Sequence, residues 1–179
     1  FYSYSVNVSV KREEKVYKDA LRRLGKANVL PAEPEEYHFP EGGTKELKHP
    51  VVIIGMGPAG LFCAYYLAQH GYATLLLERG ADVDARQADV EAFWQTGKLK
   101  PDSNVQFGEG GAGTFSDGKL NTLVKDKYGR NTEVLKTFVE HGADPAIVYQ
   151  AKPHIGTDVL SRVVKSMRQE ILRLDGEVR

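Results

Sequence analysis

The sequence has 179 residues and a formal net charge of zero, with 24 basic and 24 acidic side chains. Because no basic stripe stands out, we expect no nucleic-acid partner. The longest apolar runs fall well short of the ~20 residues that span a bilayer, so we expect neither a membrane partner nor a signal peptide. The one cysteine, Cys63, excludes an internal disulfide and indicates a cytoplasmic protein, in which we expect this thiol to be buried and inert.

The first 50 residues predict a small module followed by a linker. Strict alternation of apolar and polar residues predicts a half-buried strand over residues 1–10, and helical spacing predicts a helix over residues 13–24 with Gly25 as its C-terminal cap. Because this piece cannot bury both its faces, we assign residues 1–27 to a partial N-terminal α+β module. Residues 28–50 are rich in proline and glycine and are predicted to form a linker.

The chain is organised around residues 51–79. A short apolar strand opens this segment, Gly55, Gly57 and Gly60 follow at G-x-G-x-x-G spacing, and an apolar helix and a second apolar strand complete a βαβ unit. The predicted fold class is α/β, with residues 51–179 forming the N-terminal part of a doubly wound Rossmann-type domain that binds FAD or NAD(P). The alternative is a glycine-rich turn in an ordinary α/β domain. We expect a piece of a longer protein, because the sequence stops where another strand begins.

Each residue type in this unit has a physical reason. Gly55 permits a sharp turn, Gly57 lets the backbone approach a pyrophosphate, and Gly60 lets the helix pack close to the sheet. The unpaired amides at the start of the helix favour an anion. Glu78 closes the second strand, where a carboxylate accepts hydrogen bonds from ribose hydroxyls and repels a 2′-phosphate, which disfavours NADP.

Three further helices are predicted downstream. Helical spacing indicates helices over residues 84–96 and 131–141, and a third that Thr157 should cap. The third carries a clean apolar stripe, which marks a core face. In the first of them, Trp94 is expected on the inner face together with Val90.

Two features outside the βαβ unit are candidates for cofactor contacts. Arg86 could bind a phosphate bidentately, although a solvated surface arginine is an equal alternative. Five glycines fall within residues 108–118, a density typical of backbone that lies against a flat ring or a phosphate, and a flexible surface loop is the alternative. Among these glycines, Ser116, Asp117 and Lys119 could contact polar ring edges.

The sequence blocks around these motifs resemble a known family. The run FGEGGAGTFSDGKLNT at residues 107–122 and the run KPHIGTD at residues 152–158 accompany the glycine fingerprint. Together they resemble bacterial FAD-dependent dehydrogenases, described as NAD(P)/FAD-dependent oxidoreductases, and are more broadly similar to flavoproteins of the glutathione-reductase type. The resemblance implies an FAD-dependent oxidoreductase, with NAD(P)H as a candidate reductant and an unspecified small-molecule substrate or electron acceptor.

The same resemblance implies which residues contact the cofactor. The pyrophosphate would lie against the first glycine turn, the ribose against Glu78 and the adenosine beside Arg79. The second glycine-rich block would approach the pyrophosphate or the isoalloxazine ring, with Lys119 tuning its electronics. No catalytic residue and no metal ligand are assigned. The predicted cofactor-binding residues are Gly55, Gly57, Pro58, Ala59, Gly60, Glu78, Arg79, Arg86, Gly110, Gly111, Gly113, Thr114, Ser116, Asp117, Gly118 and Lys119.

Two other functional hypotheses stay open. The site could hold NAD in a simple dehydrogenase. It could also belong to a flavin-binding module that senses redox state or modifies RNA without independent turnover. In each case the chain by itself is expected to be inactive.

Overall fold

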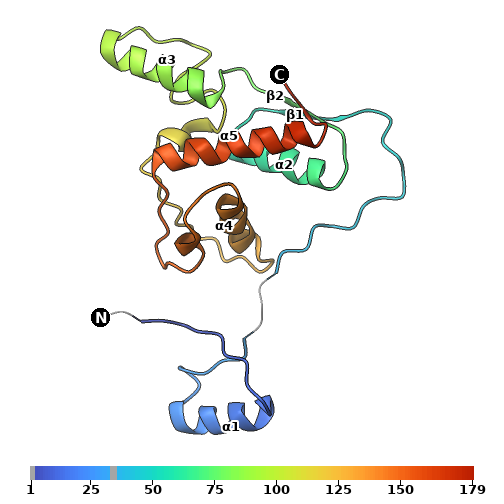
Figure 1. Ribbon diagram of the computed structural model, residues 1–179, viewed down its shortest axis with the longest axis vertical. Helices are drawn as coiled ribbons and strands as arrows, with labels where there is room; N and C mark the ends of the chain where they lie inside the picture. The colour runs from blue at the N-terminus through green and yellow to red at the C-terminus, as the bar shows by residue number, and fades with distance from the viewer. Residues whose placement is uncertain (1–2, 33–35) are drawn as a thin grey trace. The chain divides into compact units, whose positions relative to one another are not determined.

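The computed structural model describes residues 3–32 and 36–179, and it divides into two compact units that meet in sequence at Glu36 and Tyr37 (Figure 1). Within these described ranges, no helix is both long and apolar enough to cross a membrane. The second unit contains the glycine fingerprint and all the predicted cofactor-binding residues.

The first unit is built on helix α1 (Glu13–Leu24), as predicted, and the chain leaves the helix at Gly25 with a φ of 79°. The acidic side chains of its first turn and the basic ones of its last turn complement the helix dipole. The strand predicted over residues 1–10 is wrong for residues 3–10, which form no strand, and residues 1–2 lie outside the described residues. A strand needs a neighbour for its backbone groups, and the described part of this unit has none.

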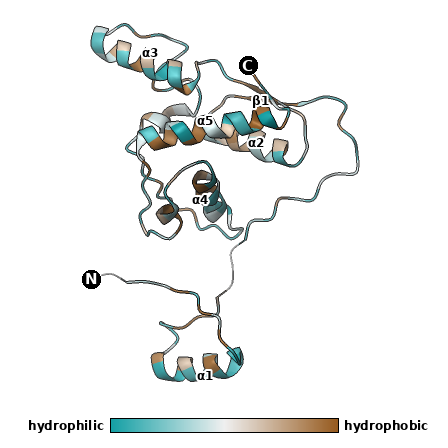
Figure 2. Cartoon of the chain, in the orientation of Figure 1, coloured by the Kyte–Doolittle hydropathy of each residue, from teal (hydrophilic) through white to brown (hydrophobic). Residues whose placement is uncertain are grey.

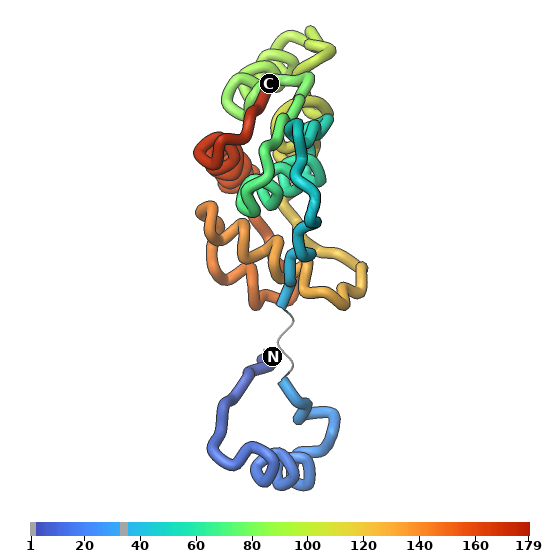
Figure 3. The backbone as a smooth tube through the Cα atoms, turned by 90° about the vertical axis from the view of Figure 1, so that its right-hand side faces the viewer, coloured from blue at the N-terminus to red at the C-terminus, as the bar shows by residue number. Residues whose placement is uncertain are grey.

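The second unit contains a three-stranded parallel sheet in the order β1 (Val51–Ile54), β2 (Thr74–Leu77), β3 (Glu177–Val178). The predicted βαβ unit is confirmed, because α2 (Pro58–Gln69) connects the first two strands and parallel neighbours need such a crossover. Figure 3 shows the end of the chain returning alongside β2.

Helices α2 and α5 (Thr157–Arg173) pack against each other and against one face of this sheet. The apolar stripe of α5 is confirmed as core, and Figure 2 shows hydrophobic and hydrophilic residues alternating along this helix. Its N-cap is Gly156, so Thr157 is the first helical residue and not the predicted cap. The fully or nearly fully buried residues of this core include Met56, Leu61, Ala64, Leu76, Val163, Met167 and Ile171.

Two expectations about side-chain burial are wrong. Cys63 is exposed on α2, because Leu61, Ala64 and Tyr65 occupy the faces of that helix that meet the core. Trp94 is 66% exposed, whereas Val90 on the same helix is buried. In both cases a helix is apolar on more than one side, and spacing alone does not say which side the core covers.

The predicted helices over residues 84–96 and 131–141 are confirmed as α3 (Val83–Thr96) and α4 (Arg130–Glu140). Short 3₁₀ helices add η1 (Gly111–Phe115) and η2 (Pro145–Val148). Asp82 is the N-cap of helix α3, and its carboxylate accepts hydrogen bonds from the backbone N–H groups of Asp84 and Ala85.

Two sets of contacts hold α2 in the second unit. Phe39, from the segment predicted as a linker, stacks on His70 with the ring centroids 3.7 Å apart. On the other side, the His141 ring lies 2.8 Å from the Ser166 hydroxyl and 3.0 Å from the Tyr65 hydroxyl, so it connects α2, α4 and α5. The helix that follows the glycine fingerprint therefore has a fixed place in the fold.

Candidate functional site

The glycine fingerprint forms a tight corner between β1 and α2. Gly55 has a φ of 92° and donates a hydrogen bond from its amide to the Leu77 carbonyl at 2.7 Å. A Cβ on Gly60 would collide with the carbonyl oxygen of Gly55, so this glycine lets α2 start against the end of the strand. A Cβ on Gly57 would meet no atom within 4 Å, and this glycine borders a cleft. The corner thus leaves space beside its backbone where a side chain would intrude.

The beginning of α2 presents backbone amides to this corner. No side chain caps the helix at Gly57, and Pro58 occupies its first turn. An α-helix leaves the amides of its first turn without intrahelical partners, and its dipole makes that end partly positive. Ala59 and Gly60 therefore offer N–H donors at a position that favours negative charge.

Glu78 faces the same corner from the end of β2. One carboxylate oxygen accepts a hydrogen bond from the Met56 amide at 2.6 Å, and the other accepts one from the Gly80 amide at 2.9 Å. An ionised carboxylate has about four lone-pair sites, so it can accept further bonds from the hydroxyls of a sugar. Glu78 holds the glycine turn in shape and keeps acceptor capacity for a ligand.

A cleft of about 470 Å³ opens at the carboxyl ends of β1 and β2. In an open parallel sheet this is the edge at which nucleotides bind. The guanidinium carbon of Arg79 lies 3.8 Å from the centroid of the Phe107 ring, so the two side chains form a cation–π pair at the cleft. The lining residues are Ile54, Gly55, Gly57, Leu77, Glu78, Arg79, Gln106, Phe107, Gly108 and Gly111.

The start of the second glycine-rich block lies on this corner. The Gly110 amide donates a hydrogen bond to the Met56 carbonyl at 2.8 Å. A Cβ on Gly111 would lie 3.3 Å from both the Cα of Gly57 and the Cδ of Pro58. The two glycine-rich segments, separated in sequence, therefore contribute to one surface.

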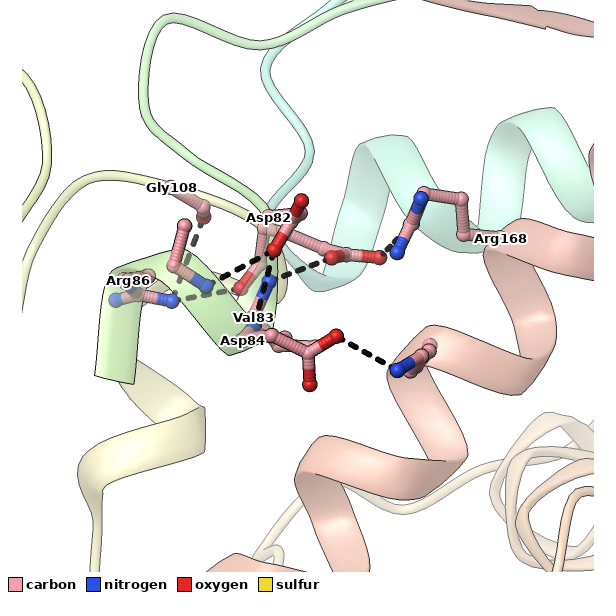
Figure 4. Close-up of polar contacts among 9 residues, drawn as sticks. Asp82, Val83, Asp84, Arg86, Gly108 and Arg168 are labelled. Atoms are coloured by element: carbon pink, nitrogen blue, oxygen red, sulfur yellow. Dashed lines mark hydrogen bonds and ion pairs between the residues drawn. The ribbon is translucent and has the colours of Figure 1, made fainter. Parts of the chain in front are cut away.

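Arg86 lies neither at the surface nor in the cleft, which are the positions of a solvated arginine and of a phosphate ligand. It is fully buried, so it is not a solvated surface arginine, and it does not line the cleft. Its guanidinium donates to protein oxygens, and Figure 4 shows its contact with the Gly108 carbonyl. Burial lowers the pKa of Arg86, which the carboxylates of Glu78 and Glu109 oppose. The acceptors are the carbonyls of Asn104 at 2.8 Å, Val105 at 2.9 Å, Gly108 at 3.5 Å and Glu109 at 2.7 Å, and the Thr114 hydroxyl at 2.8 Å.

Glu109 is a buried residue of this region that the sequence reasoning did not single out. Its side chain accepts a hydrogen bond from the Val83 amide at 2.7 Å and pairs with the Nε of Arg168, also at 2.7 Å. It therefore connects the start of α3 to α5, and Figure 4 shows Val83 and Arg168 on either side of this connection. A charged residue among glycines gave no periodic signal that could have revealed it.

The end of the second block lies elsewhere. Gly118 and Ile155 are joined by a backbone hydrogen bond of 2.8 Å, and a Cβ on Gly118 would collide with the Ile155 carbonyl. The exposed pair of Asp117 and Lys119 are 2.6 Å apart, which lowers the pKa of the carboxyl and raises the pKa of the amine. Neither these residues nor Ser116 line the cleft.

The cleft thus brings together part of the predicted set. Gly55, Gly57, Glu78, Arg79 and Gly111 line it directly. Thr114 is buried behind it, bonded to Arg86. Among residues 3–32 and 36–179, no group of three or more His, Cys, Asp or Glu side chains is arranged to hold a metal ion.

Comparison with known proteins agrees with this geometry. Residues 50–106 match the family model described as FAD dependent oxidoreductase. An uncharacterized protein of Clostridium beijerinckii is 48% identical over 176 residues, which are 98% of this chain and 32% of that protein. The chain therefore spans about a third of the length of this relative.

Shorter similarities include two proteins with named activities. A thiamine thiazole synthase of Sulfolobus acidocaldarius is 58% identical over 33 residues, 18% of this chain and 12% of that one. The putative oxidoreductase YgfK of Escherichia coli is 44% identical over 48 residues, 27% of this chain and 4% of that one. Among solved structures, THI4 of Thermovibrio ammonificans covers 73% of this chain and 37% of its own, at 19% identity and a TM-score of 0.40.

The strand order, the glycine corner and the family match define the second unit as a partial FAD-binding Rossmann-like fold. The segment that matches the FAD dependent oxidoreductase model includes the fingerprint, Glu78, Arg79 and Arg86.

Proposed function

We propose that this chain is the nucleotide-binding part of an FAD-dependent oxidoreductase. The observation that carries the proposal is the cleft at the ends of β1 and β2, where a Cβ on Gly57 would enter open space and the Glu78 carboxylate borders the same opening. Backbone without side chains beside a helix N-terminus suits a diphosphate, and a carboxylate at the end of the second strand suits a ribose. The residues present therefore fit an adenine dinucleotide.

In this proposal the residues of the chain bind and orient the cofactor. The amides of Gly57, Ala59 and Gly60 would donate to the diphosphate, and Glu78 would accept from the ribose hydroxyls. The Arg79 and Phe107 pair would flank the adenosine. When bound, FAD supplies hydride and electron transfer at its isoalloxazine ring, while the protein sets its position.

The second glycine-rich block has two parts in this proposal. Gly110, Gly111, Gly113 and Thr114 belong with the diphosphate, which the contact of Gly111 with the first glycine turn supports. Contact of Ser116, Asp117, Gly118 and Lys119 with the isoalloxazine ring is proposed from the family resemblance alone. We also propose NAD(P)H as the reductant, a small molecule as substrate or acceptor, and a glutathione-reductase type of architecture for the intact protein.

The first test is the identity of the cofactor in the full-length protein. We expect the purified protein to be yellow and to release FAD on denaturation. The Gly57→Val variant should lose this FAD, because its side chain would fill the space proposed for the diphosphate. Gly43→Val is a matched control, since a Cβ there also meets no atom within 4 Å and Gly43 does not line the cleft. Normal flavin content in the Gly57→Val protein would contradict the proposal, and release of NAD instead of FAD would favour the simple dehydrogenase.

A second test separates an enzyme from a redox-sensing or RNA-modifying module. The flavin-loaded full-length protein should oxidise NAD(P)H in the steady state when a general electron acceptor is present. A single reduction of the flavin without turnover would favour the sensing module.

A further inference from the structure

One wall of the cleft consists of backbone without regular secondary structure. Residues 104–108 belong to no helix or strand, and yet Gln106, Phe107 and Gly108 line the opening. Such a segment lacks the ladder of backbone hydrogen bonds that fixes a strand or a helix. Something else must hold it at a constant distance from the glycine corner.

Arg86 meets this requirement. Its side chain lies directly behind the wall, because a Cβ on Gly108 would be 2.5 Å from the Cδ of Arg86 and 3.0 Å from its Nε. Its guanidinium donates to the carbonyls on both sides of Phe107, at Val105 and Glu109, and to the Thr114 hydroxyl. One planar group therefore anchors the wall from behind and joins it to η1, while the Asn104 side chain, which accepts from the amides of Gln106 and Phe107, closes the turn within the segment.

The arrangement requires an arginine and not merely a positive charge. The guanidinium offers five N–H donors in a rigid planar fork, and here all three of its nitrogens donate to the protein. A lysine offers donors from a single point and could reach only some of these oxygens. No carboxylate forms an ion pair with Arg86 among the described residues, so carbonyl oxygens and the Thr114 hydroxyl accept its hydrogen bonds, and the carboxylates of Glu78 and Glu109 act on its charge from farther away.

We propose that Arg86 is a positioning residue of the cofactor site: without touching the nucleotide, it holds residues 104–109, whose Gln106, Phe107 and Gly108 form the wall of the cleft that faces the proposed diphosphate and adenosine. This inference rests on the proposed function. It differs from direct phosphate binding in what Arg86 contacts, because every nitrogen of its guanidinium already donates to a protein oxygen.

A nearby arginine provides a matched control. Arg168 also holds the second block, through the buried carboxylate of Glu109, and its loss should also destabilise the fold. It does not line the cleft, and it borders a second cavity of about 200 Å³, whose lining shares only Glu78 with that of the cleft. Arg86→Met and Arg168→Met each remove one arginine that anchors the same loop, but only the first should loosen the cleft wall.

The experiment compares Arg86→Met, Arg86→Lys and Arg168→Met in the full-length protein. It measures the Kd of ADP and of FAD for the flavin-free protein, the melting temperature, and amide hydrogen exchange. We expect Arg86→Met to raise both Kd values roughly tenfold or more, as loss of a supporting contact around a ligand site does. Arg86→Lys should have an intermediate effect. In Arg86→Met, amide exchange should accelerate over residues 104–115 and stay slow in α5. Arg168→Met should lower the melting temperature but keep both Kd values within about threefold of the wild type.

Two results would overturn the inference. One is an Arg86→Met protein that binds ADP and FAD as tightly as the wild type. The other is an Arg168→Met protein that loses as much nucleotide affinity as Arg86→Met when both variants lose the same melting temperature. The weaker binding would then come from general destabilisation. If Arg86→Met does not fold, Arg86→Lys decides, because lysine keeps the positive charge but cannot supply the planar set of donors. Weaker nucleotide binding in that variant supports the inference, and unchanged binding overturns it.

Failure of the proposed function would have a different outcome. A wild-type protein that binds ADP but carries no flavin would refute the FAD assignment and leave the test of Arg86 with ADP in force. A wild-type protein that binds neither nucleotide would overturn both proposals.

Discussion

The two glycine-rich regions of this chain reach the same cleft by different means. Residues 55–60 form a corner between a strand and a helix, and their backbone is fixed by regular hydrogen bonds on both sides. Residues 108–118 combine irregular backbone with one short 3₁₀ helix, and their backbone is fixed by Arg86, Glu109 and contacts with residues 153–155. The first region depends on local structure, whereas the second depends on side chains from distant elements.

This difference predicts that steric changes in the first region damage the whole unit and that changes in the second act locally. The largest effect is expected for Gly60→Ala. Its Cβ would collide with the Gly55 carbonyl and force α2 away from the sheet, which should cost about 2–4 kcal/mol of the free energy of unfolding. Thermal or denaturant unfolding measures this loss.

Gly57→Ala is the control for that prediction. It lies in the same corner with a φ of −70°, and its Cβ would meet no atom within 4 Å. Its stability should stay within about 0.5 kcal/mol of the wild type, as is usual for unstrained surface changes. Equal losses in the two variants would show that the corner does not rely on close contact between α2 and the strand.

A smaller and more local effect is expected for Gly118→Ala. Gly118 has a φ of 72°, and its Cβ would collide with the Ile155 carbonyl, so the substitution should break the pairing with residues 153–155. We expect faster amide exchange at Leu120 and Ile155 and a loss of about 1–3 kcal/mol. The sheet should keep its protection. Gly113→Ala, whose Cβ would meet no atom within 4 Å, is the control for stability, and loss of protection throughout the sheet after Gly118→Ala would contradict a local role.

The smallest effect concerns pH and the helix that begins at the first corner. Burial raises the pKa of both Tyr65 and Tyr66 on α2 to about 12. A tyrosine in an unfolded chain ionises near pH 10, so the folded state holds these protons more tightly. The resulting stability is fully present below about pH 10 and is lost as the pH rises towards about 12.

Melting temperatures measured across this alkaline range test that expectation. The double variant Tyr65→Phe and Tyr66→Phe should depend less steeply on pH, because phenylalanine has no proton to lose. An unchanged slope would assign the alkaline loss to other groups. In the second region, by contrast, Asp117 and Lys119 are exposed. Their hydrogen-bonded ion pair lowers the pKa of Asp117 and raises the pKa of Lys119, and salt should weaken both shifts.

Sequence reasoning succeeded where local periodicity and local spacing carry the information. Patterns within short stretches of sequence predicted the positions of β1, α2 and β2, the apolar stripe of α5 and the presence of Glu78 at the glycine corner. It failed where the outcome depends on a distant neighbour. The strand predicted at the start of the chain is absent from residues 3–10, which lack a described partner strand, and Cys63 is exposed on a helix that is apolar on every side.

The amino-acid sequence by itself determined that a βαβ unit would form a bare glycine corner with a carboxylate beside it, because strand, turn and helix signals act over short distances. Only the tertiary structure decided that Arg86 would be buried, that Glu109 would join α3 to α5, and that Gly111 would lie on Gly57. A buried charge is stable only where several distant backbone groups converge on it, and that convergence has no signature in any one stretch of the sequence.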